Sequence, residues 1–185
     1  MSDSKGRVVF EPDATILAVD DVAYANGWKE VEHFKRGERR NQEIIFELPD
    51  RETIVRGIED QFVLVVFASI TGPNSELAEK TLRDAGRALD DATLWQWTES
   101  AEPKERSFAL RAFAATSDKA ADPRVVTLYS KAVKDEHPEV RAALIEAVGR
   151  AAWPELWPVV DELAGAGTAE AAVLKQSYEK HIPRK

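Results

Sequence analysis

The sequence predicts an α+β fold, in which a small antiparallel sheet with a packed helix precedes about three α-helical hairpins. Its 185 residues, 44% hydrophobic and 31% charged, have the size and balance of a globular chain that buries its own core. The pattern changes near Gly72: short β-branched and aromatic runs precede it, and alanine-rich segments with helical spacing follow it. We therefore divide the chain into a strand-rich part, 1–88, and a helical part, 89–185.

In the strand-rich part, short apolar runs separated by turn residues predict an antiparallel meander. Pro49 and Asp50 would form one turn, and Glu59 and Asp60 the next. The expected strands are residues 43–48, 53–58 and 62–70, with 7–10 and 31–34 as further strands. The segment 15–24 fits either a strand or a helix.

A turn and a helix should join the two parts. Gly72, Pro73, Asn74 and Ser75 are turn residues that end in a helix cap. An apolar stripe follows, formed by Leu77, Ala78, Leu82, Ala85 and Leu89. We expect this stripe to pack against the sheet.

The helical part contains an internal repeat. Residues 102–106 (EPKER) and 137–141 (HPEVR) each place proline in a first helical turn and arginine three residues later, at an offset of 35 residues. The helix that begins at Pro138 has one apolar face, formed by Val140, Ala143, Leu144, Ala147 and Val148. The preceding segment has the same period and would be its partner helix.

Residues 123–152 resemble a HEAT repeat. The resemblance rests on Asp135, Pro138, Val140 and Arg141, followed by alanines and Gly149 along the second helix. It implies a curved stack of helix pairs that serves as a protein-binding scaffold, in which aspartate and arginine often form a ladder between repeats.

The neighbouring repeats depart from this pattern. The earlier copy has Glu105 in the place of Val140, and the third hairpin has Lys175 and Gln176 where an interior repeat would be apolar. A polar outer face is typical of the last repeat in a stack. The resemblance therefore covers residues 89–185 and not the strand-rich part.

Composition excludes several classes of chemistry and partner. With no cysteine, the chain has no disulfide, thiolate zinc site or cysteine nucleophile. A net charge of −8 disfavours nucleic acid. The exception is a basic cluster, Lys35, Arg36, Arg39 and Arg40, which we interpret as a solvated hairpin tip rather than an anion site. The polar start of the chain lacks the apolar core of a secretory signal, and no apolar run could span a membrane, so we expect a cytoplasmic protein without a membrane partner.

No motif indicates a catalytic, cofactor-binding or metal-binding site. His33, His137 and His181 are not at ligand spacing, and Asp20 and Asp21 fit a helix start or turn better than a cation site. Phosphate-loop, nucleophile-elbow and zinc-protease motifs are absent from the sequence. We therefore favour a non-catalytic protein. An acid–base pair of carboxylates among the 33 acidic residues stays open as the enzymatic alternative.

The leading functional hypothesis is a protein-interaction module, an adaptor or an inhibitor of a specific partner, which the acidic charge suggests is basic. Two alternatives follow from the HEAT resemblance. One is an accessory enzyme of the bilin-lyase type, which would hold a planar ligand between aromatic side chains. The other is a HEAT-like DNA-repair glycosylase, which requires a basic concave face.

The surface of the second helices is the expected partner site. The 35-residue offset pairs Lys104 with Glu139, and Arg111 with Glu146, either as exposed salt bridges or as the rim of a binding surface. Arg150 and Trp97 complete this predicted surface. Trp153 and Trp157, which are four residues apart and each followed by proline, fit packing between repeats better than an interface.

Overall fold

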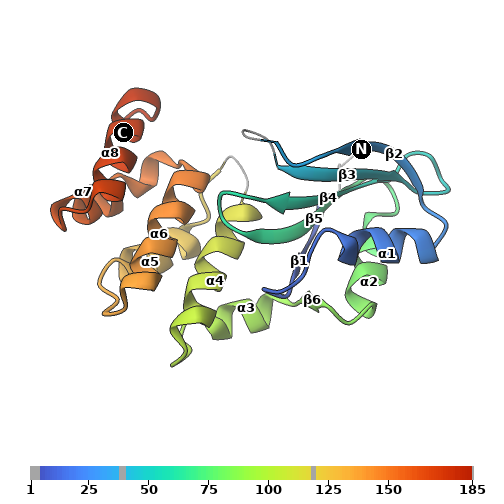
Figure 1. Cartoon of the computed structure of the whole chain (residues 1–185), viewed down its shortest axis with the longest axis horizontal. Helices are drawn as coiled ribbons and strands as arrows, with labels where there is room; N and C mark the ends of the chain where they lie inside the picture. The colour runs from blue at the N-terminus through green and yellow to red at the C-terminus, as the bar shows by residue number, and fades with distance from the viewer. Residues whose placement is uncertain (1–4, 38–40, 118–119, 185) are drawn as a thin grey trace. The chain divides into compact units, whose positions relative to one another are not determined.

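The computed structural model describes residues 5–37, 41–117 and 120–184 (Figure 1). It confirms the α+β class, with an antiparallel sheet followed by helices. The chain divides into two compact units, Met1–Thr93 and Leu94–Lys185, whereas the sequence pattern placed a boundary after residue 88. Each unit has its own hydrophobic core.

The first unit is built on one six-stranded sheet with the order β2-β3-β4-β5-β1-β6, in which every pair of neighbours is antiparallel. The strands are β1 (Lys5–Phe10), β2 (Lys29–Phe34), β3 (Gln42–Glu47), β4 (Ile54–Asp60), β5 (Val65–Thr71) and β6 (Ala88–Leu89). Strands β3 to β5 form the predicted meander. The further strands expected at 31–34 and 7–10 are β2, which pairs with β3, and β1, which returns to pair with β5.

The predicted turn at Glu59 and Asp60 is wrong, because both residues belong to β4 and the turn occupies residues 61–64. The buried Asp60 carboxylate accepts the backbone N–H groups of Phe62 (2.9 Å) and Val63 (3.3 Å), so it ends the strand and starts the turn. Phe62 and Leu64, expected in the next strand, are exposed in this turn.

Two helices, α1 (Leu17–Ala25) and α2 (Ser75–Asp84), cover one face of the sheet (Figure 1). The ambiguous segment 15–24 is therefore mainly helical. Ala78 and Leu82 pack on the sheet as expected. The predicted stripe is wrong at its other three positions, because Leu77 is exposed, Ala85 is exposed just after the end of α2, and Leu89 lies in β6.

The second unit consists of three consecutive helix pairs. The helices are α3 (Asp91–Trp97), which spans the boundary between the units, α4 (Pro103–Ala115), α5 (Pro123–Ala132), α6 (Pro138–Ala151), α7 (Trp157–Gly165) and α8 (Ala169–His181), with a 3-10 turn η1 (Pro154–Leu156). Proline begins α4, α5 and α6, where its missing N–H costs no helical hydrogen bond. The second helices of the pairs pack in sequence, α4 on α6 and α6 on α8.

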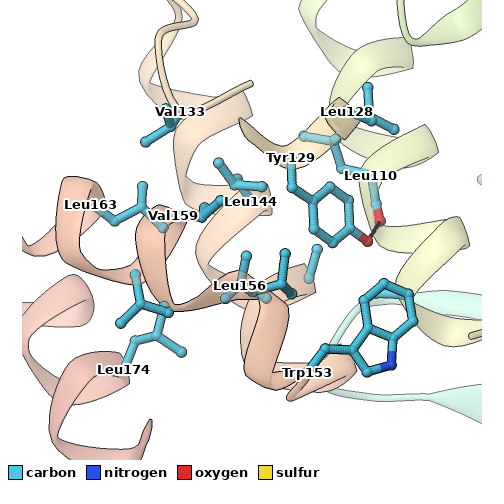
Figure 2. Close-up of a cluster of buried hydrophobic side chains, with 14 of the residues drawn as sticks. Leu110, Leu128, Tyr129, Val133, Leu144, Trp153, Leu156, Val159, Leu163 and Leu174 are labelled. Carbon is cyan, nitrogen blue, oxygen red and sulfur yellow. Dashed lines mark hydrogen bonds between the residues drawn. The ribbon is translucent and has the colours of Figure 1, made fainter. Parts of the chain in front are cut away.

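The core between these helices is apolar and closely packed (Figure 2). Two buried tyrosine hydroxyls in this core are hydrogen-bonded: Tyr129 Oη donates to the Leu110 carbonyl (2.9 Å) and Tyr178 Oη to the Val148 carbonyl (3.1 Å). Burial raises the pKa of both tyrosines. Trp153 and Trp157 are 2% and 6% exposed and belong to this core, in agreement with their interpretation as packing residues.

Candidate functional site

A groove lies where the connections of the first two helix pairs meet, and we call it the loop-end groove. Its main part, of about 510 Å³, is lined by the α3–α4 connection, the first half of α4, the end of α5 and the α5–α6 connection. An adjoining depression of about 470 Å³ shares Thr98, Glu99, Leu128 and Lys131 with it and is bounded by Trp95. Two helix pairs thus form one continuous hollow.

An ion pair between Arg106 and Asp135 lies in the main part of the loop-end groove. Arg106 Nε is 2.9 Å from Asp135 Oδ2 and Nη2 is 3.1 Å from Oδ1, a bidentate arrangement. Nη1 donates to the carbonyls of Ser100 (2.6 Å) and Ala101 (3.1 Å). The two side chains are only 15% and 14% exposed, so the guanidinium joins α4 to two connections within the protein.

The pKa values of this pair reflect the same contacts. The hydrogen bond to Asp135 raises the pKa of Arg106. Burial raises the pKa of Asp135, but hydrogen bonds from Arg106 and from the His137 N–H outweigh burial, so the net shift is downward. Both groups are therefore charged at neutral pH and are bonded to each other.

The arginine contact repeats one helix pair later. Arg141 donates from Nη1 to the Asp135 carbonyl, as Arg106 does to the Ser100 carbonyl, and both residues of the second contact are 35 positions further on. Asp135 thus bonds arginines of two successive repeats. The 35-residue repeat in the sequence identifies Arg106 and Arg141 as equivalent residues, but it does not predict that Arg106 pairs with Asp135.

Trp95 forms the aromatic wall of the groove. Its ring centroid is 4.4 Å from that of Phe113, and the Arg124 guanidinium lies 5.4 Å from the Trp95 ring centroid. Trp97, the predicted binding residue, instead meets Phe108 edge-on and does not line the groove. Helical periodicity predicts that the side chains of Trp95 and Trp97 point in different directions, but it does not predict which of the two rings borders the groove.

The rim of the groove carries charges of both signs. Lys131 and Lys134 are exposed on one side, and Glu99 and Glu136 are also exposed. The groove therefore offers a ligand an aromatic wall, the apolar side chains of Leu110 and Leu128, and exposed charges at its edge. Within the described ranges, no group of three or more histidine, aspartate or glutamate side chains is placed to hold a metal ion.

The predicted partner surface on the second helices is only partly assembled. Arg111 Nε lies 2.6 Å from Glu146 Oε2, so the 35-residue offset does place this pair together across α4 and α6. Lys104 and Glu139 are exposed in the first turns of α4 and α6, and no ion pair joins them among the described residues. Arg150 is exposed in the last turn of α6, away from the groove.

The other charged candidates are placed individually. In the basic cluster, Arg36 pairs with Glu59, Lys35 is exposed, and Arg39 and Arg40 lie outside the described residues. The three histidines are apart: His33 is near Glu30, His137 near Glu136, and His181 is exposed at the end of α8.

Comparison with known proteins does not assign the chain to a family. No family model matches the sequence, and no curated protein or solved structure matches the chain. Across the part of the chain that the structure describes, no helix has the length and apolar character needed to cross a membrane.

Proposed function

We propose that this chain is a non-catalytic protein-interaction module whose helical unit binds a segment of a partner protein in the loop-end groove. The observation that carries the proposal is the state of the groove's central charges: Arg106 and Asp135 are bonded to each other and to the backbone. Charges engaged in this way hold the shape of a site and are not free to act as acid, base or nucleophile.

The remaining contacts suit a protein segment. Tryptophan is enriched among the residues that dominate protein interfaces, and Trp95 presents a ring beside the apolar Leu128. The rim would add specificity, with Lys131 and Lys134 facing acidic side chains of the partner and Glu99 a basic one. The HEAT resemblance of residues 89–185, a scaffold of helix pairs, supports the same function.

The predicted surface residues fit this site to different degrees. Lys104 and Glu139 lie in the first turns of α4 and α6, the end of these helices at which the groove opens, so we include them in its margin. Arg111 and Glu146 would extend the margin along the helices. Trp97 lies outside the groove, and we replace it with Trp95 as the aromatic anchor.

The two enzymatic alternatives have less support. A planar ligand held between aromatic rings, as in a bilin-lyase-type enzyme, would need a pocket with rings on two sides. The loop-end groove has one tryptophan ring, Trp95, in its lining, and Trp153 and Trp157 belong to the packed core. A DNA-repair glycosylase would need a basic face, whereas α4 and α6 carry Glu139 and Glu146 among their basic residues.

Affinity capture from the source cell with matched variants tests the proposal. Lys131→Glu reverses an exposed rim charge, and Lys180→Glu makes the same change on α8, outside the groove. We expect Lys131→Glu to reduce recovery of the partner by about tenfold, equivalent to roughly 1.4 kcal/mol, while Lys180→Glu retains it. Equal recovery with both folded variants would place the partner elsewhere.

A further inference from the structure

The first unit has a groove of its own, between α1 and α2, which we call the α1–α2 groove. Its volume is about 560 Å³. Its apolar lining includes Phe10 of β1 and Val22 of α1, and small residues, Ala18, Ala25 and Ala85, line it along the two helices. Small side chains leave open a channel above the sheet that larger ones would fill.

Exposed apolar side chains lie on the two helices that form this groove. Leu77 is 60% exposed and lies four residues before Thr81, a lining residue, on the same face of α2. On α1, Leu17 (56% exposed) and Tyr24 (88% exposed) are four residues before and three residues after the lining residue Asp21. Large apolar side chains that gather around a hollow are typical of an interaction surface.

The rim of the α1–α2 groove is acidic. Asp21 lies on its α1 side, with no ion-pair partner among the described residues, and Asp84 lies on its α2 side. Asp84 pairs with Lys80 four residues earlier, and such exposed pairs contribute little to stability, so a partner's cation could replace Lys80. Arg87, the basic lining residue, is engaged by Glu11 and Asp13.

The net charge of the chain is concentrated in this unit. Residues 1–93 contain 12 lysines and arginines against 19 aspartates and glutamates, a net charge of −7. Residues 94–185 contain 13 against 14, a net charge of −1. A basic partner would therefore be attracted to the first unit much more than to the helical unit.

We propose that the α1–α2 groove binds a basic amphipathic helix of a partner protein. The apolar face of that helix would cover Leu17, Leu77 and the groove floor, and its lysines or arginines would meet Asp21 and Asp84. This is the helix-in-groove mode of recognition. A second copy of this chain fits less well, because two acidic rims would face each other.

This inference does not depend on the loop-end groove, with which the α1–α2 groove shares no residue. If both sites operate, the chain holds two partners and is an adaptor. If only one operates, it is a single-partner binder, as an inhibitor would be.

The probe for the test is a fluorescent leucine–lysine peptide of about 14 residues, four helical turns with one apolar face, titrated into the full chain and followed by anisotropy. Asp21→Lys should weaken binding by about tenfold. The matched control Glu32→Lys reverses an exposed charge on β2. Glu32 lies opposite Ile45 of β3, on the face of the sheet that the helices do not cover. The peptide affinity of this control should stay within about twofold of the wild-type value.

A second pair of variants tests the apolar contact. Leu77→Ser should weaken peptide binding by about fivefold or more, whereas Phe62→Ser, which removes a similarly exposed side chain from the β4–β5 turn, should not. Circular dichroism and thermal unfolding of each variant establish that the first unit is folded.

Four outcomes would overturn the inference. They are no binding by the wild-type chain, equal binding of a scrambled peptide without an apolar face, and equal losses in Asp21→Lys and Glu32→Lys. The fourth is a dimer of the wild-type chain in light scattering that Leu77→Ser dissociates, which would make a second copy the occupant. Lys131→Glu, which lies in the loop-end groove, should leave peptide binding unchanged. The outcome of this test is therefore independent of the outcome of the test of the loop-end groove.

Discussion

At the scale of single residues, buried and half-buried carboxylates organise the connections of both units. Asp60 ends β4 by accepting two backbone N–H groups, and Asp135 holds the α5–α6 connection to Arg106. Asp50 does the same between β3 and β4, where it accepts N–H groups from Glu52 and Thr53. A charged acceptor makes each of these hydrogen bonds stronger than a neutral one would.

The pKa of Asp50 provides the first prediction. The hydroxyl of Thr53, which donates to Asp50 Oδ2 at 2.6 Å, is the main cause that lowers the pKa of this carboxyl to about 2. Thr53→Val removes that donor, so the pKa should rise toward its ordinary value. A carboxyl-carbon NMR titration checks this, and an unchanged pKa would contradict the assignment.

The same shift has a consequence for stability. Because the folded-state pKa lies below the unfolded value, the contribution of Asp50 is present above about pH 4 and is lost as the pH falls toward about 2. Thr53→Val should therefore lose less stability than the wild type over this acid range. Urea unfolding at several pH values measures the difference, and equal acid slopes would count against it.

The Arg106–Asp135 pair provides a second residue-scale prediction. Replacing either partner with alanine leaves a nearly buried charge without its counterpart, which should lower the free energy of unfolding by roughly 3 kcal/mol. The double variant should recover part of that loss. Denaturant unfolding gives the free energy of unfolding of the wild type, the two single variants and the double variant. If each single variant loses less than about 1 kcal/mol, the pair does not hold the connections together.

At the scale of elements, packing between neighbours decides which residues are tolerated. α1 lies so close to β4 that a Cβ atom on Gly57 would come within 3.0 Å of the Val19 side chain. In the second unit, equivalent helices pack side by side, and the Arg111–Glu146 pair joins two of them. Both contacts connect elements that are distant in sequence.

Gly57→Ala tests the approach of α1 to the sheet. The added methyl group should force Val19 to move and cost about 1–3 kcal/mol, as overpacking of a core does. Val19→Ala in the same chain provides the space and should recover a measurable part of that loss. Thermal unfolding of the three variants checks this, and a neutral Gly57→Ala would mean that α1 readily shifts.

The Arg111–Glu146 pair tests the margin of the proposed binding site. Exchanging the charges, with Arg111→Glu and Glu146→Arg together, keeps the pair and should change stability by less than about 1 kcal/mol. If the margin extends along α4 and α6, partner capture per folded molecule should fall. A large loss of stability with intact capture would make this surface structural.

The element scale also shows what could be predicted from sequence. Short apolar runs separated by turn residues predict the meander, and the proline–arginine repeat predicts the second helices and the contact of Arg111 with Glu146. The turn at residues 61–64 was missed because a buried carboxylate, rather than hydrophobicity, ends β4. The loop-end groove was missed because side chains from two connections form it, and helical periodicity says nothing about connections.

At the scale of the whole molecule, the two units differ in charge and in the surfaces they offer. The acidic first unit has a groove with an apolar border, and the nearly neutral helical unit has a groove with an aromatic wall and a mixed rim. The proposed basic partner would be attracted mainly to the first unit, which carries most of the net charge. The central claim remains that the helical unit binds protein in the loop-end groove.

Site-specific photo-crosslinking in the source cell tests this claim most directly. A photoreactive amino acid at position 131, an exposed site that borders both parts of the loop-end groove, should join the chain to one defined protein. The same group at position 180, exposed on α8, should not. The absence of an adduct at position 131, or the same adduct from both positions, would contradict the account.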